Sequence, residues 1–173
     1  MIKHSIIPFL ILAIFTLQAN AQKFAYVDSE YILSEMPEYE KAQEQLNDLA
    51  QSWQEEIEIK LKEVDEMYKT FKAEQVMLTD KMKEQRIAEI EAKELEIKEY
   101  QTQKFGPDGE LFLKRSELIK PLQDMIFEEL QKMAELKGYD FIFDKSGGNF
   151  MLYYNKRYDK SEDILKAIRK REK

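Results

Sequence analysis

The chain has 173 residues, with 34 acidic and 27 basic side chains and a formal net charge of −7. It contains no cysteine, which excludes disulfides, thiol nucleophiles and cysteine metal sites, and its one histidine is His4. Because histidine is the commonest general base and a common zinc ligand, most nucleophilic triads and metal sites are disfavoured as well. The acidic residues are scattered along charged helical segments, so we expect no enzyme and no metal site.

The first 21 residues have the pattern of a secretory signal peptide. Lys3 and His4 form a short polar region, an apolar run follows from Ile6 to Leu17, and Ala19-Asn20-Ala21 supplies the small residues of a cleavage site. The run is shorter than the roughly 20 residues of a membrane-spanning helix, which argues against an anchor. We expect a mature chain that begins near Gln22, lacks histidine and carries a net charge of −8, because Lys3 is removed and no acid is.

Short strand-forming segments are predicted near both ends of the mature chain. Residues 23–28 predict a strand, and a brief helix from Ser29 to Met36 follows, which Pro37 is expected to close. Residues 139–144 and 150–154 predict two further strands, joined by a hairpin turn at residues 145–149. A last helix is expected after Asp159.

The stretch from Glu38 to Phe105 contains neither glycine nor proline and predicts a long antiparallel helical hairpin. Its first arm carries apolar residues at steps of three or four, which keeps them on one side of a helix. A turn is expected near residues 76–80, with Thr79 or Asp80 as the N-cap of the return helix. The predicted stripe of the first arm is Tyr39, Ala42, Leu46, Leu49, Trp53, Ile57, Leu61, Val64, Tyr68 and Phe71. The return arm is less apolar, with Met82, Ile87, Ile90, Leu95, Ile97 and Tyr100.

The segment Gly106-Pro107-Asp108-Gly109 interrupts the return arm, and a helical pattern resumes from Glu110 to Lys137. Pro121 lies inside that pattern and predicts a kink or a joint, and Gly138 is expected to end the helix. Two interpretations of the break stay open. Gly106, Pro107 and Gly109 either form a hinge that lets the arm splay, or belong to a static loop that corrects a mismatch in arm length.

The predicted β-containing part is too small to bury a substantial core alone. Two or three short strands leave open edges, and their apolar side chains cannot all be covered within one small sheet. We therefore expect a homo-oligomer, with a trimer as the first hypothesis, in which several copies share one body. The residues predicted at this interface are Phe24, Tyr26, Val27, Phe141, Phe143 and Leu152.

The order of these parts resembles the Skp/OmpH family of periplasmic chaperones. The likeness runs from Lys23 to Ile168 and is most specific in the first strand, Lys23-Phe24-Ala25-Tyr26-Val27-Asp28, and in residues 137–154. It implies a mainly α, α+β fold in which a helical hairpin, residues 38–121, projects from a β-containing body, residues 22–37 and 122–173. It also implies a trimer, a periplasmic location, no cofactor, and an ATP-independent holdase activity toward unfolded outer-membrane β-barrel proteins in a cavity between the arms.

The residues hypothesised to contact such client chains lie on the hairpin and at its tip. They are Trp53, Met67, Tyr68, Phe71, Met77, Leu78 and Met82. For Trp53, Met67, Tyr68 and Phe71 an alternative stays open, namely that they form ordinary hairpin core, because they follow the helical contact stripe.

The charge departs from the family pattern, in which basic arm tips are associated with anionic lipids. Residues 72–86 hold four bases and three acids, so the tip is near neutral and we expect weak or no direct membrane binding. The negative net charge argues against nucleic-acid binding, since contact with phosphates depends on clustered bases. The main alternative function is a structural coiled-coil protein of the envelope, or a docking arm for a single partner.

Overall fold

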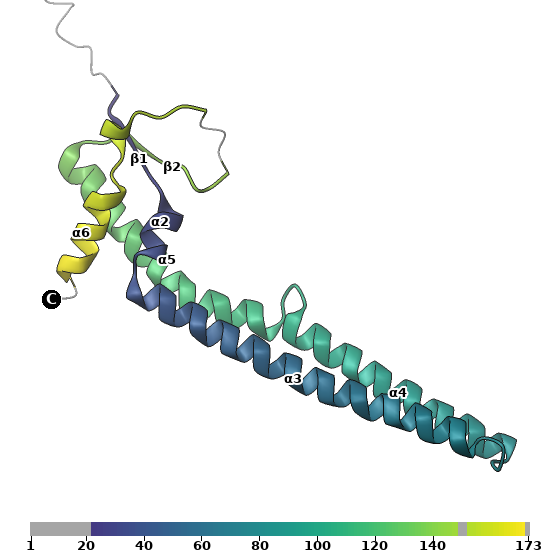
Figure 1. Ribbon diagram of the computed structural model, residues 1–173. Helices are drawn as coiled ribbons and strands as arrows, with labels where there is room; N and C mark the ends of the chain where they lie inside the picture. Colours follow the sequence, from purple (N-terminus) through teal and green to yellow (C-terminus); the bar gives the residue numbers. More distant parts are fainter. Residues whose placement is uncertain (1–21, 149–151, 172–173) are drawn as a thin grey trace, which may run out of the picture. The chain divides into compact units, whose positions relative to one another are not determined.

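The computed structural model describes residues 22–148 and 152–171 (Figure 1). The predicted signal peptide and residues 149–151 of the predicted β-hairpin lie outside these ranges. The chain divides into two compact units, one formed by the described residues up to Glu30 and from Phe127 onward, the other by Tyr31–Ile126. As the sequence predicts, the fold is mainly α with a small β part.

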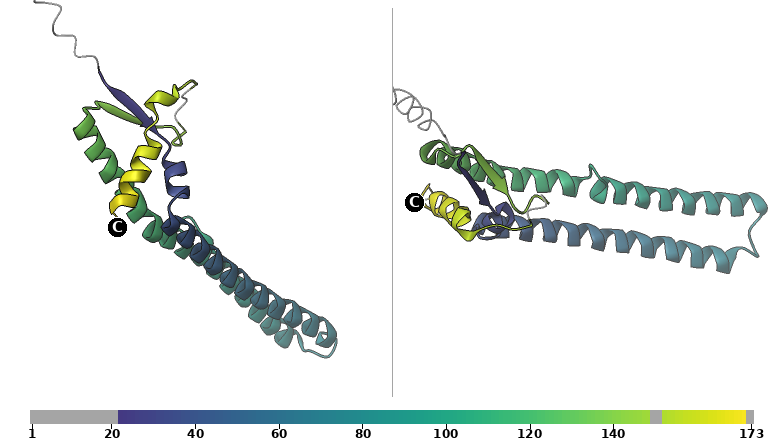
Figure 2. Two further views of the ribbon diagram at one scale, coloured as in Figure 1. Left: turned by 60° about the vertical axis from the view of Figure 1, so that its left-hand side comes forward. Right: turned by 90° about the horizontal axis from the view of Figure 1, so that it is seen from above.

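The Tyr31–Ile126 unit is a long helical hairpin. Helix α3 spans Pro37–Glu74 and helix α4 spans Asp80–Phe105, and the two lie side by side (Figures 1 and 2). The Thr79 side chain accepts a hydrogen bond from the Met82 N–H at 3.4 Å, which caps α4 as predicted. Helix α5, Glu110–Lys137, begins directly after the predicted break.

Pro37 has a different role from the one predicted, while Pro121 lies inside a helix, where a kink stays a prediction. Helix α2, Ser29–Ser34, ends before Pro37, and Pro37 opens α3 rather than closing the preceding helix. This position suits proline because the first N–H groups of a helix have no partner within it. Helix α5 continues through Pro121, so this residue lies inside one helix and does not separate two.

The other unit carries a two-stranded sheet. Strand β1, Phe24–Val27, pairs in parallel with β2, Phe141–Asp144, so that Phe24 faces Phe141 and Val27 faces Asp144 (Figure 1). Both strands are predicted by the sequence, but their parallel pairing is not. On the other edge of β1, the Lys160 N–H donates to the Tyr26 carbonyl at 2.9 Å.

The predicted antiparallel return strand is wrong for the residues that the structure describes. Leu152–Tyr154 has no regular structure, and a short 3-10 helix η2, Lys156–Tyr158, follows it. The Asp144 carboxylate accepts hydrogen bonds from the Ser146 N–H and hydroxyl at 3.0 and 2.8 Å.

The core of this unit is small and lies around helix α6, Ser161–Arg171. Ile164, Leu165 and Ile168 of α6 are fully buried, as are Ala25 and Val27 of β1. Gly138 adopts a positive φ of 65° directly after α5, as expected of a glycine that ends a helix. The buried set is thin, and several aromatic side chains of the unit stay outside it.

Candidate functional site

The seam between α3 and α4 follows alternating steps of three and four residues, the spacing of a coiled coil. Its centre is a buried cluster of Ile57 and Val64 from α3 with Ile90 and Ile97 from α4. Met67, Phe71 and Tyr100 pack against this cluster. The full seam consists of Trp53, Ile57, Lys60, Val64, Met67 and Phe71 on α3 and of Ile90, Lys93, Ile97, Tyr100 and Lys104 on α4.

This seam differs in phase from the predicted stripe. Both pass through Ile57, Val64 and Phe71, but the prediction places Leu61 and Tyr68 between them, and these side chains are 48% and 39% exposed. Lys60 and Met67 occupy the intervening seam positions instead. The sequence favours apolar residues at each step, whereas in the structure Lys60 lies on the seam and pairs with a carboxylate on α4.

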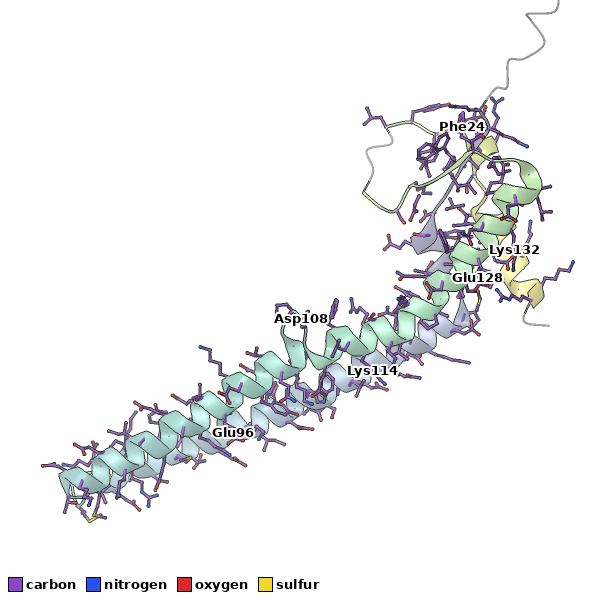
Figure 3. All side chains as sticks on the ribbon, turned by 180° about the vertical axis from the view of Figure 1, so that it is seen from behind. Phe24, Glu96, Asp108, Lys114, Glu128 and Lys132 are labelled. Atoms are coloured by element: carbon purple, nitrogen blue, oxygen red, sulfur yellow. The ribbon has the colours of Figure 1, made fainter. Side chains whose placement is uncertain are left out.

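Charged residues complete the seam where apolar ones are missing. The Lys60 and Lys93 ammonium groups lie 3.2 and 3.0 Å from carboxylate oxygens of Glu96, which Figure 3 labels on α4. Hydrogen bonds from Lys93 and Lys60 lower the pKa of Glu96 below its usual range. The lysine stems cover apolar surface while their charges stay at the edge. Between α3 and α4, the buried apolar core is therefore small.

Large apolar side chains on the hairpin point away from the seam. Met82, Ile87 and Leu95, predicted as part of the return arm's apolar set, are exposed, and of these only Met82 is a predicted client contact. The exposed apolar residues missed as client contacts include Ile59, Leu61, Ile87, Leu95, Phe112 and Leu113. These residues could have been recognised in the sequence as apolar residues outside the coiled-coil positions, but only once the seam positions are known.

Two shallow hollows lie among these exposed residues. One of about 740 Å³ is lined by Leu95, Leu113 and the Gly106–Gly109 segment. Another of about 570 Å³ is lined by Ile59 and Phe71 among other residues. Small-molecule sites usually enclose their ligand with convergent polar groups. Open hollows with apolar walls instead fit single side chains of an extended polypeptide.

The seven residues predicted to contact clients are not brought together into one site. Met67 and Phe71 pack on the hairpin core, and the Trp53 ring meets the Phe105 ring edge-on with centroids 6.0 Å apart. Met77, at the turn, is 78% exposed. Among the others, Tyr68 and Met82 are exposed and Leu78 is half-buried.

The break in the return arm is a compact loop. The Gly106 N–H donates to the Thr102 carbonyl at 2.8 Å, and the Gly109 N–H donates to the Gly106 carbonyl at 2.9 Å. A Cβ on Gly106 would lie 2.4 Å from the Thr102 carbonyl oxygen, and one on Gly109 would lie 2.9 Å from the Lys104 carbonyl oxygen. Glycine is therefore required at both positions by close backbone approach. Asp108 lies in the loop that projects between α4 and α5 (Figure 3).

The residues predicted at an oligomer interface separate into two groups. Tyr26 and Val27 are buried within the single chain. Phe141 is 52% exposed, and its ring stacks on that of Phe143 with centroids 6.3 Å apart. Phe24, labelled in Figure 3, stays half-exposed although its ring meets the Tyr158 ring at 4.8 Å. The remaining member of the predicted set, Leu152, is almost fully exposed.

A partly buried carboxylate fixes the end of β2 to the start of α2. Asp144 accepts hydrogen bonds from the Ser29 N–H at 3.1 Å and from the Ser29 hydroxyl at 2.5 Å, in addition to those from Ser146. Partial burial raises the pKa of Asp144, but the hydrogen bonds from Ser29 and Ser146 outweigh it and hold the pKa below its usual range. Lys145 adds an ion pair with Asp28 at 2.8 Å. This network was not predicted, because its members lie more than 100 residues apart in the sequence.

Across residues 22–148 and 152–171, no group of three or more His, Cys, Asp or Glu side chains is arranged to hold a metal ion. In the same ranges, no helix has the length and apolarity needed to cross a membrane.

This chain is similar to known proteins in fold and in sequence. A solved structure from Caulobacter crescentus, described provisionally as an OmpH-like outer membrane chaperone, matches with a TM-score of 0.69 over 87% of this chain and 85% of that chain. Its sequence is 13% identical, so this likeness concerns the fold. An uncharacterized protein of Aquifex aeolicus is 29% identical over 147 residues, which is 85% of this chain and 86% of the relative.

The family model that describes OmpH-like outer membrane proteins matches residues 23–168. This range includes both strands, the hairpin and all but the end of α6. The chain therefore belongs to the OmpH-like family.

Proposed function

We propose that this protein is an ATP-independent periplasmic holdase that binds unfolded outer-membrane β-barrel proteins and prevents their aggregation. The observation that carries the proposal is the set of outward apolar side chains along a charged helical hairpin, represented by Ile59, Leu95 and Leu113. Family membership and the likeness to a provisionally described chaperone support it.

Scattered apolar side chains suit this task because unfolded barrel strands alternate apolar and polar residues. Each exposed leucine or phenylalanine can add about 1 kcal/mol when a client covers its remaining surface. Several such contacts hold a chain, yet none requires a defined client sequence. The client is released without ATP hydrolysis when its folding into the membrane is more favourable than the sum of these contacts.

The proposal includes a homo-oligomer, with a trimer as the first hypothesis. The sheet has two strands, and Phe24, Phe141 and Phe143 remain about half-exposed beside it. Covering these rings with other copies would remove a contiguous aromatic surface from water. In this arrangement residues 22–37 and 122–173 form the shared body, residues 38–121 form each arm, and the clients lie in a cavity between the arms.

Export places this function in the periplasm, with residues 1–21 acting as a cleaved signal peptide. The acidic hairpin supports weak or absent membrane binding and no nucleic-acid partner. Residues 35–58 illustrate this, since they carry eight acidic side chains and one basic side chain, Lys41.

The second candidate function is a structural envelope protein whose hairpin docks a single partner. The observation that favours it is the weakly apolar seam, because such a surface could be completed by one specific partner helix. A holdase protects many unrelated unfolded chains, whereas a docking arm binds one folded partner tightly.

Light scattering of an unfolded outer-membrane protein, diluted out of denaturant with and without the purified mature chain, separates the two. We expect suppressed scattering at stoichiometric amounts for several unrelated β-barrel clients, without nucleotide. Unchanged aggregation of every client tested would refute the holdase function.

A further inference from the structure

A cluster of four side chains bridges the break in the return arm. Lys104, on the last turn of α4, places its Nζ 2.6 Å from a carboxylate oxygen of Glu110, the first residue of α5. The same Nζ lies 4.8 Å from the ring centre of Trp53 on α3 and 5.3 Å from that of Tyr100. The Lys104 side chain is 13% exposed, so the cation is largely withdrawn from water. Trp53, Tyr100, Lys104 and Glu110 are called the Lys104 cluster below.

Further contacts tie the cluster to both arms. The Gln103 side chain donates to Glu110 at 3.0 Å, a second connection across the break. The Tyr100 hydroxyl donates to the Glu56 carboxylate on α3. This hydrogen bond, with burial as a second cause, raises the pKa of Tyr100 to about 12.

The cluster joins α5 to the two helices from which a bend at the break would move it. Glu110 belongs to α5, Lys104 to α4 and Trp53 to α3, while the loop between Lys104 and Glu110 is closed by its own backbone hydrogen bonds. A rotation of α5 away from α4 would separate Glu110 from Lys104. Lys104 would keep its ring contacts with Trp53 and Tyr100 but lose its carboxylate partner, so a cation largely withdrawn from water would be left without a counter-ion.

We infer that the Lys104 cluster is a clasp that makes the return arm continuous across the break, and that the arm bends at Gly106–Gly109 only when Glu110 leaves Lys104. The break is then neither a free hinge nor a permanently static loop, but a joint whose opening the cluster controls. This inference concerns the hairpin itself, so it stands or falls independently of the proposed holdase function.

The test replaces Lys104 with methionine, which keeps an apolar stem of similar length and removes the charge. The matched control is Lys114→Met, because Lys114 also forms a lysine–glutamate pair, with Glu117 at 2.9 Å, but both partners lie within α5 (Figure 3). Amide hydrogen exchange is followed at Gly106, Gly109 and Leu113, whose N–H groups close the loop and start α5. Trp53 is the one tryptophan in the chain, so its quenching by acrylamide reports the same site.

We expect Lys104→Met to accelerate exchange at these amides about tenfold and to raise the quenching of Trp53, because a partly desolvated cation–π contact and an ion pair are both lost. Lys104→Arg, which retains the charge and the ring contact, should stay close to wild type, and so should Lys114→Met. Exchange and quenching in Lys104→Met that match those of Lys114→Met would overturn the inference.

A double-mutant cycle with Glu110→Gln isolates the pair from the effect of Glu110 on its own helix end. If the clasp exists, the double variant Lys104→Met/Glu110→Gln exchanges about as fast as Lys104→Met alone. Fully additive effects on exchange would show that the two side chains act separately, which contradicts the clasp.

Discussion

Neighbouring positions on α4 allow the stabilising core and the proposed client surface to be separated by mutation. Ile97 is 2% exposed and belongs to the hairpin core, whereas Leu95, two residues earlier, is 56% exposed. Leu113 on α5 is 58% exposed and lines the same hollow as Leu95. The perturbation compares Ile97→Ala with the double variant Leu95→Gln/Leu113→Gln, since glutamine has nearly the helix propensity of leucine.

Ile97→Ala should change mainly the stability, and the double leucine variant should change mainly the affinity for clients. Ile97→Ala removes buried methyl groups and leaves a cavity, so we expect a loss of about 2–4 kcal/mol in the free energy of unfolding. The double leucine variant alters exposed sites and should change that free energy by less than about 0.5 kcal/mol per site. For client binding, each leucine has about half of its surface left to bury, about 1 kcal/mol, so both together should weaken the dissociation constant about thirtyfold.

The assay pairs two measurements on the same samples. Urea unfolding followed by Trp53 fluorescence gives the stability of the hairpin, because this single tryptophan lies on α3 beside Phe105. Titration of a fluorescently labelled unfolded outer-membrane protein gives the client affinity at a temperature where every variant is folded.

The reasoning predicts stability loss with retained affinity for Ile97→Ala, and affinity loss with retained stability for the leucine double variant. It would be refuted by a leucine double variant that binds the client as tightly as wild type. It would also be refuted if the affinity of the folded Ile97→Ala protein fell as far as that of the double variant.

Three further predictions concern assembly, electrostatics and membranes. Phe141→Asp should dissociate the oligomer in sedimentation experiments while the arms keep most of the helix content, because an unpaired charge in a shared core costs several kcal/mol; a variant that stays fully assembled contradicts the interface. Asp144→Asn should destabilise the protein by about 1–2 kcal/mol at neutral pH by weakening its charged hydrogen bonds. Folding lowers the pKa of Asp144, so its contribution to stability is present above the unfolded pKa of about 3.9 and is lost as the pH falls through the folded pKa. The difference in unfolding free energy between wild type and Asp144→Asn should therefore shrink in acid. A difference that grows in acid contradicts this role. Co-flotation with anionic vesicles should be weak at physiological salt, and tight, salt-sensitive binding would show that the charge layout of the hairpin tip has been misjudged.

The helices and their ends could be predicted from the sequence because the signals are local. Thr79 caps α4, the Gly106–Gly109 segment separates α4 from α5, and Gly138 ends α5, each at the predicted place. These residues act through their own backbone conformation or hydrogen bonds within a few positions. Local chemistry is sufficient to place such boundaries.

The features that the sequence did not reveal depend on contacts between distant segments. The parallel pairing of β1 with β2 joins residues more than 100 positions apart. The local pattern of residues 150–154 predicts a return strand, but residues 152–154 have no regular structure. The phase of the hairpin seam also depends on a contact between distant segments. Leu61 and Lys60 are equally possible at the helical period, and the packing of α3 against α4 places Lys60, which pairs with Glu96, on the seam. The exposed candidate contacts could not be identified until that phase was fixed.

Site-specific photo-crosslinking tests the central claim, that outward apolar residues of the hairpin hold unfolded clients. A photoreactive amino acid is placed at Leu95, at Leu113 or, as a control, at Lys166, an exposed residue of α6. The account predicts that several unfolded outer-membrane proteins crosslink at Leu95 and Leu113, that the same proteins once folded do not, and that Lys166 gives little product. Crosslinking that is absent at both leucines, or as strong at Lys166, would contradict it.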